Sequence, residues 1–318
     1  MIEFMLAFWI IAALCIIRER RVIRIFVYFG IFSLVTSVIF MLLGSPDVAM
    51  AEAAIGAFTT VFFIVCFEKY YGLGASNETV PPRRNLKTKF RDSLANLPAA
   101  IFCTGLFALF VAFIPDIEPN TYLKDQYITY FMADIGGENA VGAIYLGYRV
   151  FDTVFEALVL VISVVAVIHM SEHTVTEVRH GRLSEIRASG MAVFTIRIIC
   201  PLLVIFGFYL IANGHISPGG GFQGGLAIAA FFICRYMVYN IYDVPIIKVI
   251  KLEEIVFVVT VVMAMFVVFL GMMNQFPAGY MNVFQDGYLM IMNFLIGMKV
   301  TCGFIILFYR YIAIERMD

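Results

Sequence analysis

Apolar runs of about 20 residues recur along the whole chain, and they constrain its fold more than any other feature. A helix of that length crosses the roughly 30 Å hydrocarbon core of a bilayer. Helices satisfy their own backbone hydrogen bonds there, which open strands cannot do. The chain is 62% hydrophobic and only 14% charged, with a mean hydropathy of +0.93. The sequence therefore predicts an all-α, polytopic integral membrane protein.

The runs predict about nine transmembrane helices in groups of three, two and four. The polar segment 68–96, which contains Pro81-Pro82-Arg83-Arg84, separates the first group from the second. A charged loop over 169–190 ends the second group, and 115–138 is predicted as a polar, acidic connection. The predicted modules are 1–75, 76–185 (with the linker) and 186–318. The predicted helices cover residues 2–17, 22–43, 46–67, 97–114, 139–168, 192–212, 222–239, 252–271 and 287–312.

Basic residues give the predicted orientation. If the N-terminus lies outside, most of the 22 Lys and Arg residues fall in the inner loops or at the C-terminus. Only Lys124 then falls in an outer loop. This asymmetry follows the positive-inside rule. It predicts an outer N-terminus and a cytoplasmic C-terminus.

Charge and cysteine usage exclude several classes of protein. The net charge of −1 gives no indication of nucleic-acid binding. The six cysteines stand singly in apolar segments, without C-x-x-C or metal-ligand spacing. Neither a disulfide framework nor an iron–sulfur site is predicted, and no catalytic residue or metal ligand is assigned.

The third predicted helix begins at Ser45-Pro46-Asp47. Ser45 can cap a helix, Pro46 suits its first turn, and Asp47 lies near the positive end of the dipole. Glu52 then lies about 9 Å inside the helix. A carboxyl group at that depth is costly, which suggests proton or ion transfer. A structural glutamate, hydrogen-bonded to a neighbouring helix, is the equally weighted alternative.

The predicted helix 139–168 carries the densest set of polar side chains. Tyr145, Arg149, Asp152 and Glu156 are spaced four, three and four residues apart, which places them on one face of a continuous helix. Ionisable groups near mid-membrane are not expected to face lipid. Arg149 can neutralise Asp152, which leaves Glu156 as the favoured proton carrier. The alternative is a buried salt bridge that fixes helix packing.

A glycine-rich segment, 213–225, joins the sixth and seventh predicted helices. Its glycines allow backbone conformations closed to other residues, and its free carbonyls or amides could meet an ion. A tight re-entrant turn with close helix packing is the alternative. His215, near the outer surface, either relays protons or caps the turn. The candidate ion-cavity residues are Pro218, Gly219, Gly220, Gly221 and Gln223.

The last predicted helix holds Lys299 about a dozen residues from either end, too deep for easy snorkelling. A buried lysine can serve as a proton site. It can equally pair with a carboxylate of a partner subunit. Asn293 lies six residues earlier and points to a different face. Glu253 and Glu254 are predicted to begin the eighth helix, where the helix dipole favours them.

Three motifs carry a resemblance to a known family. Gly-Ser-Pro-Asp-Val-Ala-Met-Ala-Glu-Ala at 44–53 is similar to the signature of the small D-type membrane protein of membrane-bound hydrogenases, which also forms part of the C-terminal region of the Mrp antiporter A protein. Asn-Ala-Val at 139–141 with Tyr-Arg-Val-Phe-Asp-Thr-Val-Phe-Glu at 148–156 resembles the E-type protein that follows it. Asn-Gly-His at 213–215 with Pro-Gly-Gly-Gly-Phe-Gln-Gly-Gly at 218–225 closely resembles the Mrp B protein, equivalent to the F-type protein of the hydrogenases. The chain thus resembles a fusion of D-, E- and B/F-like modules over nearly its whole length.

The resemblance implies a membrane subunit of a multisubunit Mrp-like cation/proton antiporter module in a prokaryotic cell (inner) membrane. The transported ions would be Na⁺ and H⁺, and the chain itself would bind no cofactor. Expected partners are large antiporter-like channel subunits, small C-, E-, F- and G-type subunits, a redox arm and the lipid bilayer. By the same analogy, Glu52, Asp152 and Glu156 would lie on the ion route.

The missing large channel subunit, to which the Mrp D/E part is usually fused, favours a redox-linked complex resembling membrane-bound hydrogenase. One alternative is a subunit of a stand-alone Mrp antiporter. Another is a scaffold that joins antiporter-like subunits to the redox arm. A self-sufficient secondary transporter is disfavoured, because it would predict inverted repeats and the sequence shows none.

Overall fold

The computed structural model describes residues 1–19, 21–71, 97–112, 121–173, 190–239, 244–272 and 281–313. Every regular element in these ranges is a helix, which confirms the predicted all-α class for the described residues. The elements are α1 (Ile2–Arg18), α2 (Val22–Leu42), α3 (Pro46–Tyr71), α5 (Leu97–Ala112), α6 (Tyr122–Asp134), α7 (Ala140–Ala143), the π-helix η2 (Ile144–Tyr148), α8 (Val150–His173), α9 (Gly190–Asn213), α10 (Gly221–Tyr239), α11 (Ile246–Met272) and α12 (Met281–Ala313).

Six of the described helices are long and apolar enough to cross a membrane: α2, α3, α8, α9, α11 and α12. The protein is therefore a multi-pass membrane protein. The predicted helices at 2–17 and 97–114 correspond to α1 and α5, which have 17 and 16 residues. The predicted helix at 222–239 corresponds to α10.

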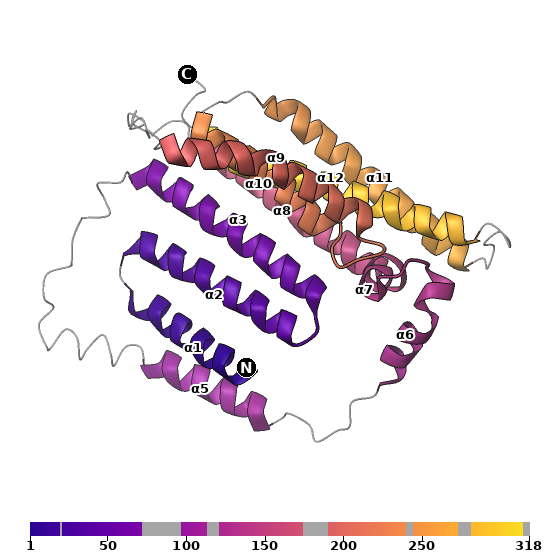
Figure 1. The fold of residues 1–318 in the computed structure, drawn as a ribbon, viewed down its shortest axis with the longest axis horizontal. Coiled ribbons are helices and arrows are strands. Elements are labelled where there is room, and N and C mark those ends of the chain that lie inside the picture. Colours follow the sequence, from indigo (N-terminus) through magenta and orange to yellow (C-terminus); the bar gives the residue numbers. More distant parts are fainter. Residues whose placement is uncertain are drawn as a thin grey trace, which may run out of the picture.

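The helices form a layered arrangement in which α1, α2 and α3 lie side by side in chain order (Figure 1). The other face of α3 packs against α10 and α12. Through these contacts the first three helices join a larger group formed by α8 to α12. The linker predicted over 68–96 falls largely outside the described residues.

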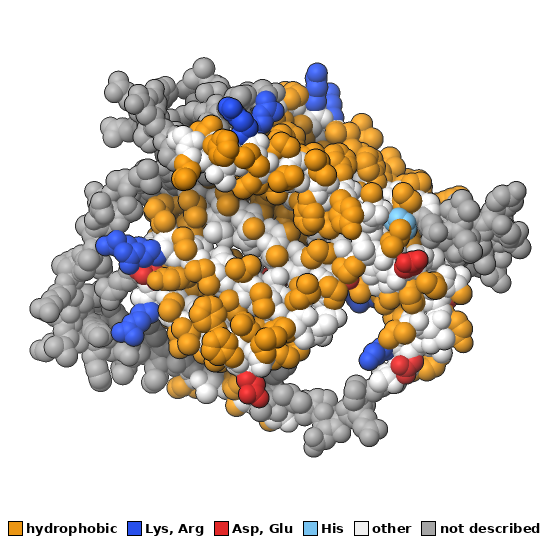
Figure 2. Space-filling model, viewed as in Figure 1, with side chains coloured by type: hydrophobic (Ala, Val, Ile, Leu, Met, Phe, Trp, Pro, Cys, Tyr) orange, Lys and Arg blue, Asp and Glu red, His pale blue; other side chains and the backbone are white. Residues whose placement is uncertain are grey.

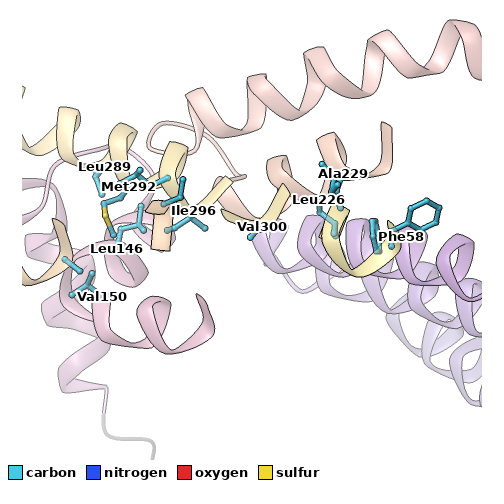
Figure 3. Packing of buried hydrophobic residues seen from close by; sticks show 14 of the residues in the cluster. Phe58, Leu146, Val150, Leu226, Ala229, Leu289, Met292, Ile296 and Val300 are labelled. Atoms are coloured by element: carbon cyan, nitrogen blue, oxygen red, sulfur yellow. The ribbon is translucent and has the colours of Figure 1, made fainter. Parts of the chain in front are cut away.

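Helix α12 is the centre of the larger group. In an 18-residue window of its apolar stretch Gly287–Tyr311, 72% of the residues are buried, against 17–22% in the corresponding windows of the other five membrane-length helices. It contacts α3, α8, α9, α10 and α11. Figure 3 shows Leu289, Met292, Ile296 and Val300 of α12 among side chains from the surrounding elements. A helix apolar on all sides is expected in such a core.

Small side chains bring α2 and α3 together. Ser37 of α2 donates a hydrogen bond of 2.6 Å to the carbonyl of Ala49 in α3. Gly56 of α3 lies against Ser33 of α2 so closely that a Cβ would overlap the serine hydroxyl. The turn between the two helices uses Gly44 at φ +76°, in the left-handed region that glycine adopts without strain.

Hydrophobic side chains cover much of the molecular face shown in Figure 2, and charged side chains lie around its rim. A membrane protein needs this distribution, because its outer surface meets lipid tails. The exposed large hydrophobic residues are numerous, and they occur on most of the described helices.

Several predicted boundaries are wrong, among them the start of α12, which lies at Met281 and not at 287. Part of the polar connection 115–138 is helical, because α6 runs from Tyr122 to Asp134. A helix that does not cross the membrane needs no apolar run, so hydropathy does not reveal it. Helix α11 begins at Ile246, two turns before the predicted start at 252. The predicted continuous helix 139–168 is divided into α7, η2 and α8.

Candidate functional site

A buried polar junction joins α3, the segment before α7, and the glycine-rich segment between α9 and α10. Asp47, in the first turn of α3, is 7% exposed. Its Oδ1 accepts hydrogen bonds from the backbone N–H of Gly219 at 3.0 Å and from Nδ2 of Asn139 at 3.2 Å. One carboxylate thus holds two segments that are 92 and 172 residues away in sequence.

Both polar atoms of the Asn139 side chain form hydrogen bonds in this junction. Its Oδ1 caps α7 by accepting from the N–H groups of Val141 at 3.1 Å and Gly142 at 3.3 Å. Its Nδ2 donates to the carbonyls of Gly214 at 3.2 Å and Ser217 at 3.1 Å, in addition to Asp47. The two backbone donors fix the orientation of the amide, because only the oxygen can accept from them.

The glycine-rich segment is shaped by close approach on both sides. Gly219 and Gly220 have φ values of +143° and +157°. A Cβ on Gly220 would strike the hydroxyl of Tyr145, and one on Gly221 would lie 2.9 Å from the backbone nitrogen of Gly297. These contacts support the tight-turn alternative from the sequence. Pro218 is exposed; the half-buried Gln223 side chain lies 3.5 Å from the Asp47 carbonyl.

Asn293 of α12 extends the junction into the core. Its Oδ1 accepts from the N–H of Gly221 at 3.1 Å and from the hydroxyl of Tyr145 at 3.3 Å. The side chain is completely buried, and its Nδ2 has no hydrogen-bond partner among the described residues. Tyr145 also lies within electrostatic reach of Asp47 and Glu156. The sequence identified Asn293 as polar but gave no sign of these partners.

His215 contributes its backbone to the junction. Its carbonyl accepts from the N–H groups of Glu138 at 2.9 Å and Asn139 at 3.0 Å. The ring is half-buried, and its enclosed Nδ1 has no hydrogen-bond partner in the part of the chain that the structure describes. Between the two predicted alternatives, the backbone contacts favour a role in shaping the turn.

Glu52 is half-buried between α2 and α3. The hydroxyl of Ser33 donates a hydrogen bond of 2.6 Å to Oε1 of Glu52, and it lies 3.2 Å from the backbone carbonyl oxygen of Glu52. The hydrogen bond to a neighbouring helix, weighed as an alternative from the sequence, is therefore present. It does not exclude proton transfer, because a hydroxyl can also pass a proton to a carboxylate.

The predicted single-face stripe on 139–168 is wrong, because a π-turn changes the helical register. Residues 144–148 form the π-helix η2, and Arg149 follows with non-helical backbone angles of −118° and 34°. The hydroxyl of Thr153 donates a hydrogen bond of 2.6 Å to the carbonyl of Tyr145, in place of a backbone hydrogen bond lost at the break. Tyr145 consequently faces Asn293. A π-turn inside a helix is frequently found at a functional site.

The other three members of the stripe, Arg149, Asp152 and Glu156, are exposed on this chain. Arg149 pairs with Asp152 at 2.6 Å, as predicted, although both side chains are more than half exposed. Charged groups in a membrane-spanning segment are costly against lipid. This face of α8 is therefore expected to meet another subunit or a water-filled space.

A second buried site lies between α11 and α12. Lys299 of α12 forms an ion pair with Glu253 of α11, and the side chains are 1% and 3% exposed. The predicted role of Glu253 at a helix start is wrong, because α11 begins seven residues earlier at Ile246. Lys299 pairs within the chain, so the alternative of a partner subunit's carboxylate is not needed. Lys248 and Lys251 interrupt the apolar pattern before Glu253, so no clear signal in the sequence marks the earlier helix start.

Metal ligation has no support in the described part of the chain. No group of three or more His, Cys, Asp and Glu side chains is placed there to hold a metal ion. The polar groups that do converge there are carboxylates, carbonyls, amides and hydroxyls.

Two family models match this chain. Residues 191–306 match a domain related to the MnhB subunit of Na⁺/H⁺ antiporters, and residues 7–71 match MbhD, the D component of MBH. A putative antiporter subunit mnhA2 of Staphylococcus saprophyticus is 30% identical over 154 residues, which cover 48% of this chain and 17% of that protein. An uncharacterized protein of Methanocaldococcus jannaschii is 32% identical over 164 residues, covering 46% and 60%. The chain thus spans under a fifth of the antiporter subunit's length.

Two solved structures share the fold. A chain of the Mrp complex from Dietzia sp. superposes with a TM-score of 0.67 at 20% identity, covering 95% of this chain and 34% of that one. A chain of the membrane-bound sulfane sulfur reductase, an archaeal respiratory membrane complex, superposes with a TM-score of 0.50 at 25% identity. That match covers 69% of this chain and 96% of the other.

Proposed function

We propose that this chain, which is a fusion of Mrp-type and MBH-type membrane subunits, works in a multisubunit cation/proton antiporter module. The match of residues 191–306 to a domain related to the MnhB subunit of Na⁺/H⁺ antiporters carries the proposal. The match of residues 7–71 to MbhD supports a link to a redox-driven complex. The likeness to a nearly complete chain of an archaeal respiratory membrane complex supports the same link.

The proposed architecture has about nine transmembrane helices, grouped three, two and four. Its modules are 1–75, 76–185 and 186–318, which are D-, E- and B/F-like. The N-terminus lies outside and the C-terminus in the cytoplasm, because the basic residues concentrate in the loops that this orientation places inside. Partners are large antiporter-like subunits, small C-, E-, F- and G-type subunits and a redox arm.

The proposed ion route uses the exposed charged face of α8, formed by Arg149, Asp152 and Glu156. Asp152 is held by Arg149, so Glu156 is the acid on this face that is available for proton exchange. Tyr145 lies within electrostatic reach of Glu156 and bonds to Asn293, which connects this face to the buried junction. Na⁺ and H⁺ are the transported ions, and the chain needs no cofactor of its own.

A scaffold is the second candidate, and the junction favours it. The buried carboxylate of Asp47 accepts hydrogen bonds that hold the glycine-rich segment in place. The carboxylate of Glu52 accepts a hydrogen bond from Ser33. A scaffold would need these bonds but no change of protonation. The two candidates therefore differ in whether the acids must titrate.

Glu156→Gln separates the two candidates, because glutamine keeps the size and most hydrogen bonding but cannot titrate. Vesicles containing the native complex are energised, and pH-gradient dissipation is recorded on sodium addition, with subunit content checked by blotting. We expect exchange to be lost in a normally assembled Glu156→Gln complex. Wild-type exchange in that complex would reject the proton route through Glu156 and favour the scaffold function.

Glu254→Gln is the matched control. Glu254 is also exposed, but two exposed lysines, Lys248 and Lys251, precede it within two turns of α11. Glu254 belongs to α11 and not to the charged face of α8 formed by Arg149, Asp152 and Glu156. We expect exchange close to the wild-type rate in this variant.

A further inference from the structure

The Glu253–Lys299 pair lies outside the charged face of α8 and outside the junction. It connects α11 with the central helix α12, inside the part of the chain that matches the MnhB-related domain. Lys299 is the midpoint of the apolar stretch Gly287–Tyr311. Its ammonium also lies 5.2 Å from the centre of the Phe257 ring. A full pair of opposite charges is therefore enclosed at membrane depth.

The heights of the two residues agree along the antiparallel helices. Lys299 is 18 residues from Met281, where α12 begins, and Glu253 is 19 residues from Met272, where α11 ends. At about 1.5 Å per residue, both lie roughly 27–29 Å from the connection between the helices. The pair is thus aligned by the fold and does not depend on a stretched side chain.

The pair is poorly built as a device for stability alone. An ammonium group has three donors, and beyond the ion pair Lys299 Nζ has no hydrogen-bond partner in the described structure. Glu253 Oε1 likewise has none beyond Lys299. A buried ion pair offsets its desolvation only when further hydrogen bonds satisfy both groups. Apolar residues of similar volume would hold these helices at least as well.

We propose that Glu253 and Lys299 form a proton-exchange site inside the MnhB-related domain. The proton moves from Lys299 Nζ to Glu253 Oε1, and a charged pair becomes a neutral amine and carboxylic acid. The net charge stays at zero, and the enclosed charges disappear. The neutral amine can then accept a proton from one side while the carboxylic acid releases its proton to the other, which restores the charged pair.

The surroundings suit such a site. Cys302, a buried thiol three residues along α12, lies within electrostatic reach of Lys299. Asn293, six residues earlier on the same helix, holds the Tyr145 hydroxyl at the junction. The rise between Asn293 and Lys299 is about 9 Å. The site therefore lies on the same helix as the polar junction, and the inference rests on the proposed antiporter function.

Lys299→Arg tests the site, because arginine retains the charge and the ion pair but does not release its proton. The native complex in energised vesicles is assayed for sodium-dependent dissipation of the pH gradient. We expect normal assembly and loss of exchange. Lys251→Arg, at an exposed position on α11, is the matched control and should exchange as the wild type does. Wild-type exchange in assembled Lys299→Arg complex would overturn the proposal.

A second variant covers the case in which the longer arginine prevents assembly. Glu253→Gln combined with Lys299→Met removes both buried charges at similar volume, so the complex should assemble. We expect it to lose exchange. Assembly together with wild-type exchange would show that the pair is dispensable and would overturn the proposal.

A measurement independent of transport separates this inference from the proposed function. Infrared difference spectra of the wild-type complex, recorded after a pH step, should contain a protonated-carboxyl band that Glu253→Gln removes and Glu254→Gln retains. If wild-type vesicles show no exchange but this band is present, the antiporter function fails while the proton site stands. A spectrum unchanged by Glu253→Gln would overturn the site.

Discussion

Removing the carboxylate of Asp47 tests the junction directly, because one of its two hydrogen-bond donors has other acceptors and the other has none among the described residues. Asp47→Ala removes the acceptor of the Gly219 N–H and of Asn139 Nδ2. Asn139 keeps the carbonyls of Gly214 and Ser217 as acceptors. The loss therefore falls on the buried N–H of Gly219.

One buried donor left without an acceptor costs about 1–3 kcal/mol. Asp47→Asn keeps an oxygen at the position of Oδ1, so both hydrogen bonds can persist without the charge. We expect Asp47→Ala to lower the free energy of unfolding by about 1–3 kcal/mol more than Asp47→Asn does. The comparison separates the geometry of the acceptor from its charge.

The assay is unfolding of the purified full chain in detergent micelles by increasing sodium dodecyl sulfate, followed by far-ultraviolet circular dichroism. Asp125→Ala is the matched control, because Asp125 is exposed on α6 and should change stability by less than about 0.5 kcal/mol. Equal losses for Asp47→Ala and Asp47→Asn would refute the argument from the Gly219 donor. So would an Asp47→Ala chain as stable as the control.

Three further outcomes are expected. Gly220→Ala should impair exchange, because a side chain is strained at its φ of +157° and its Cβ would strike the Tyr145 hydroxyl; wild-type exchange would contradict this close approach. Gly56→Ala should lower the midpoint of unfolding, because the new Cβ overlaps a serine of α2. Gly105→Ala should leave the midpoint unchanged, because nothing lies near the new Cβ on α5. Equal midpoints for the two variants would contradict the close packing of α2 and α3. A cysteine replacing Asn85 in a cysteine-free chain should react with an impermeant maleimide only after permeabilisation, and labelling of intact cells would reverse the proposed orientation.

Hydropathy predicted most of the fold correctly because membrane solvation imposes one dominant rule. A run of apolar residues that crosses the bilayer must be helical, and the boundaries of α2 differ from the prediction by one residue. The same rule does not reveal α6, which has only 13 residues and includes three charged ones, or the early turns of α11, where lysines interrupt the apolar pattern. Length and hydropathy also do not decide how helices group in space.

Side-chain partners were harder to predict than helices, for two reasons. Spacing assigns a face only while the helix keeps one period, and the π-turn at 144–148 ends that period before Arg149. Partners from distant segments, such as Asp47 and Gly219, depend on tertiary packing that spacing does not contain. The Arg149–Asp152 pair was predictable because both residues lie after the break, three residues apart on one segment.

The placement of both polar sites on α12 restricts how the chain can work. Between Asn293 and Lys299 lies Gly297, against which Gly221 and Gly225 of α10 pack with no space for a Cβ. Small residues at such a crossing let helix backbones meet and favour close packing in membranes. Sliding α12 along α10 would push side chains into this contact and would also strain the Asn293–Gly221 hydrogen bond. The exchange proposed for this chain is therefore expected to use proton transfer and side-chain movement beside a fixed α10–α12 unit, and not relative motion of these two helices.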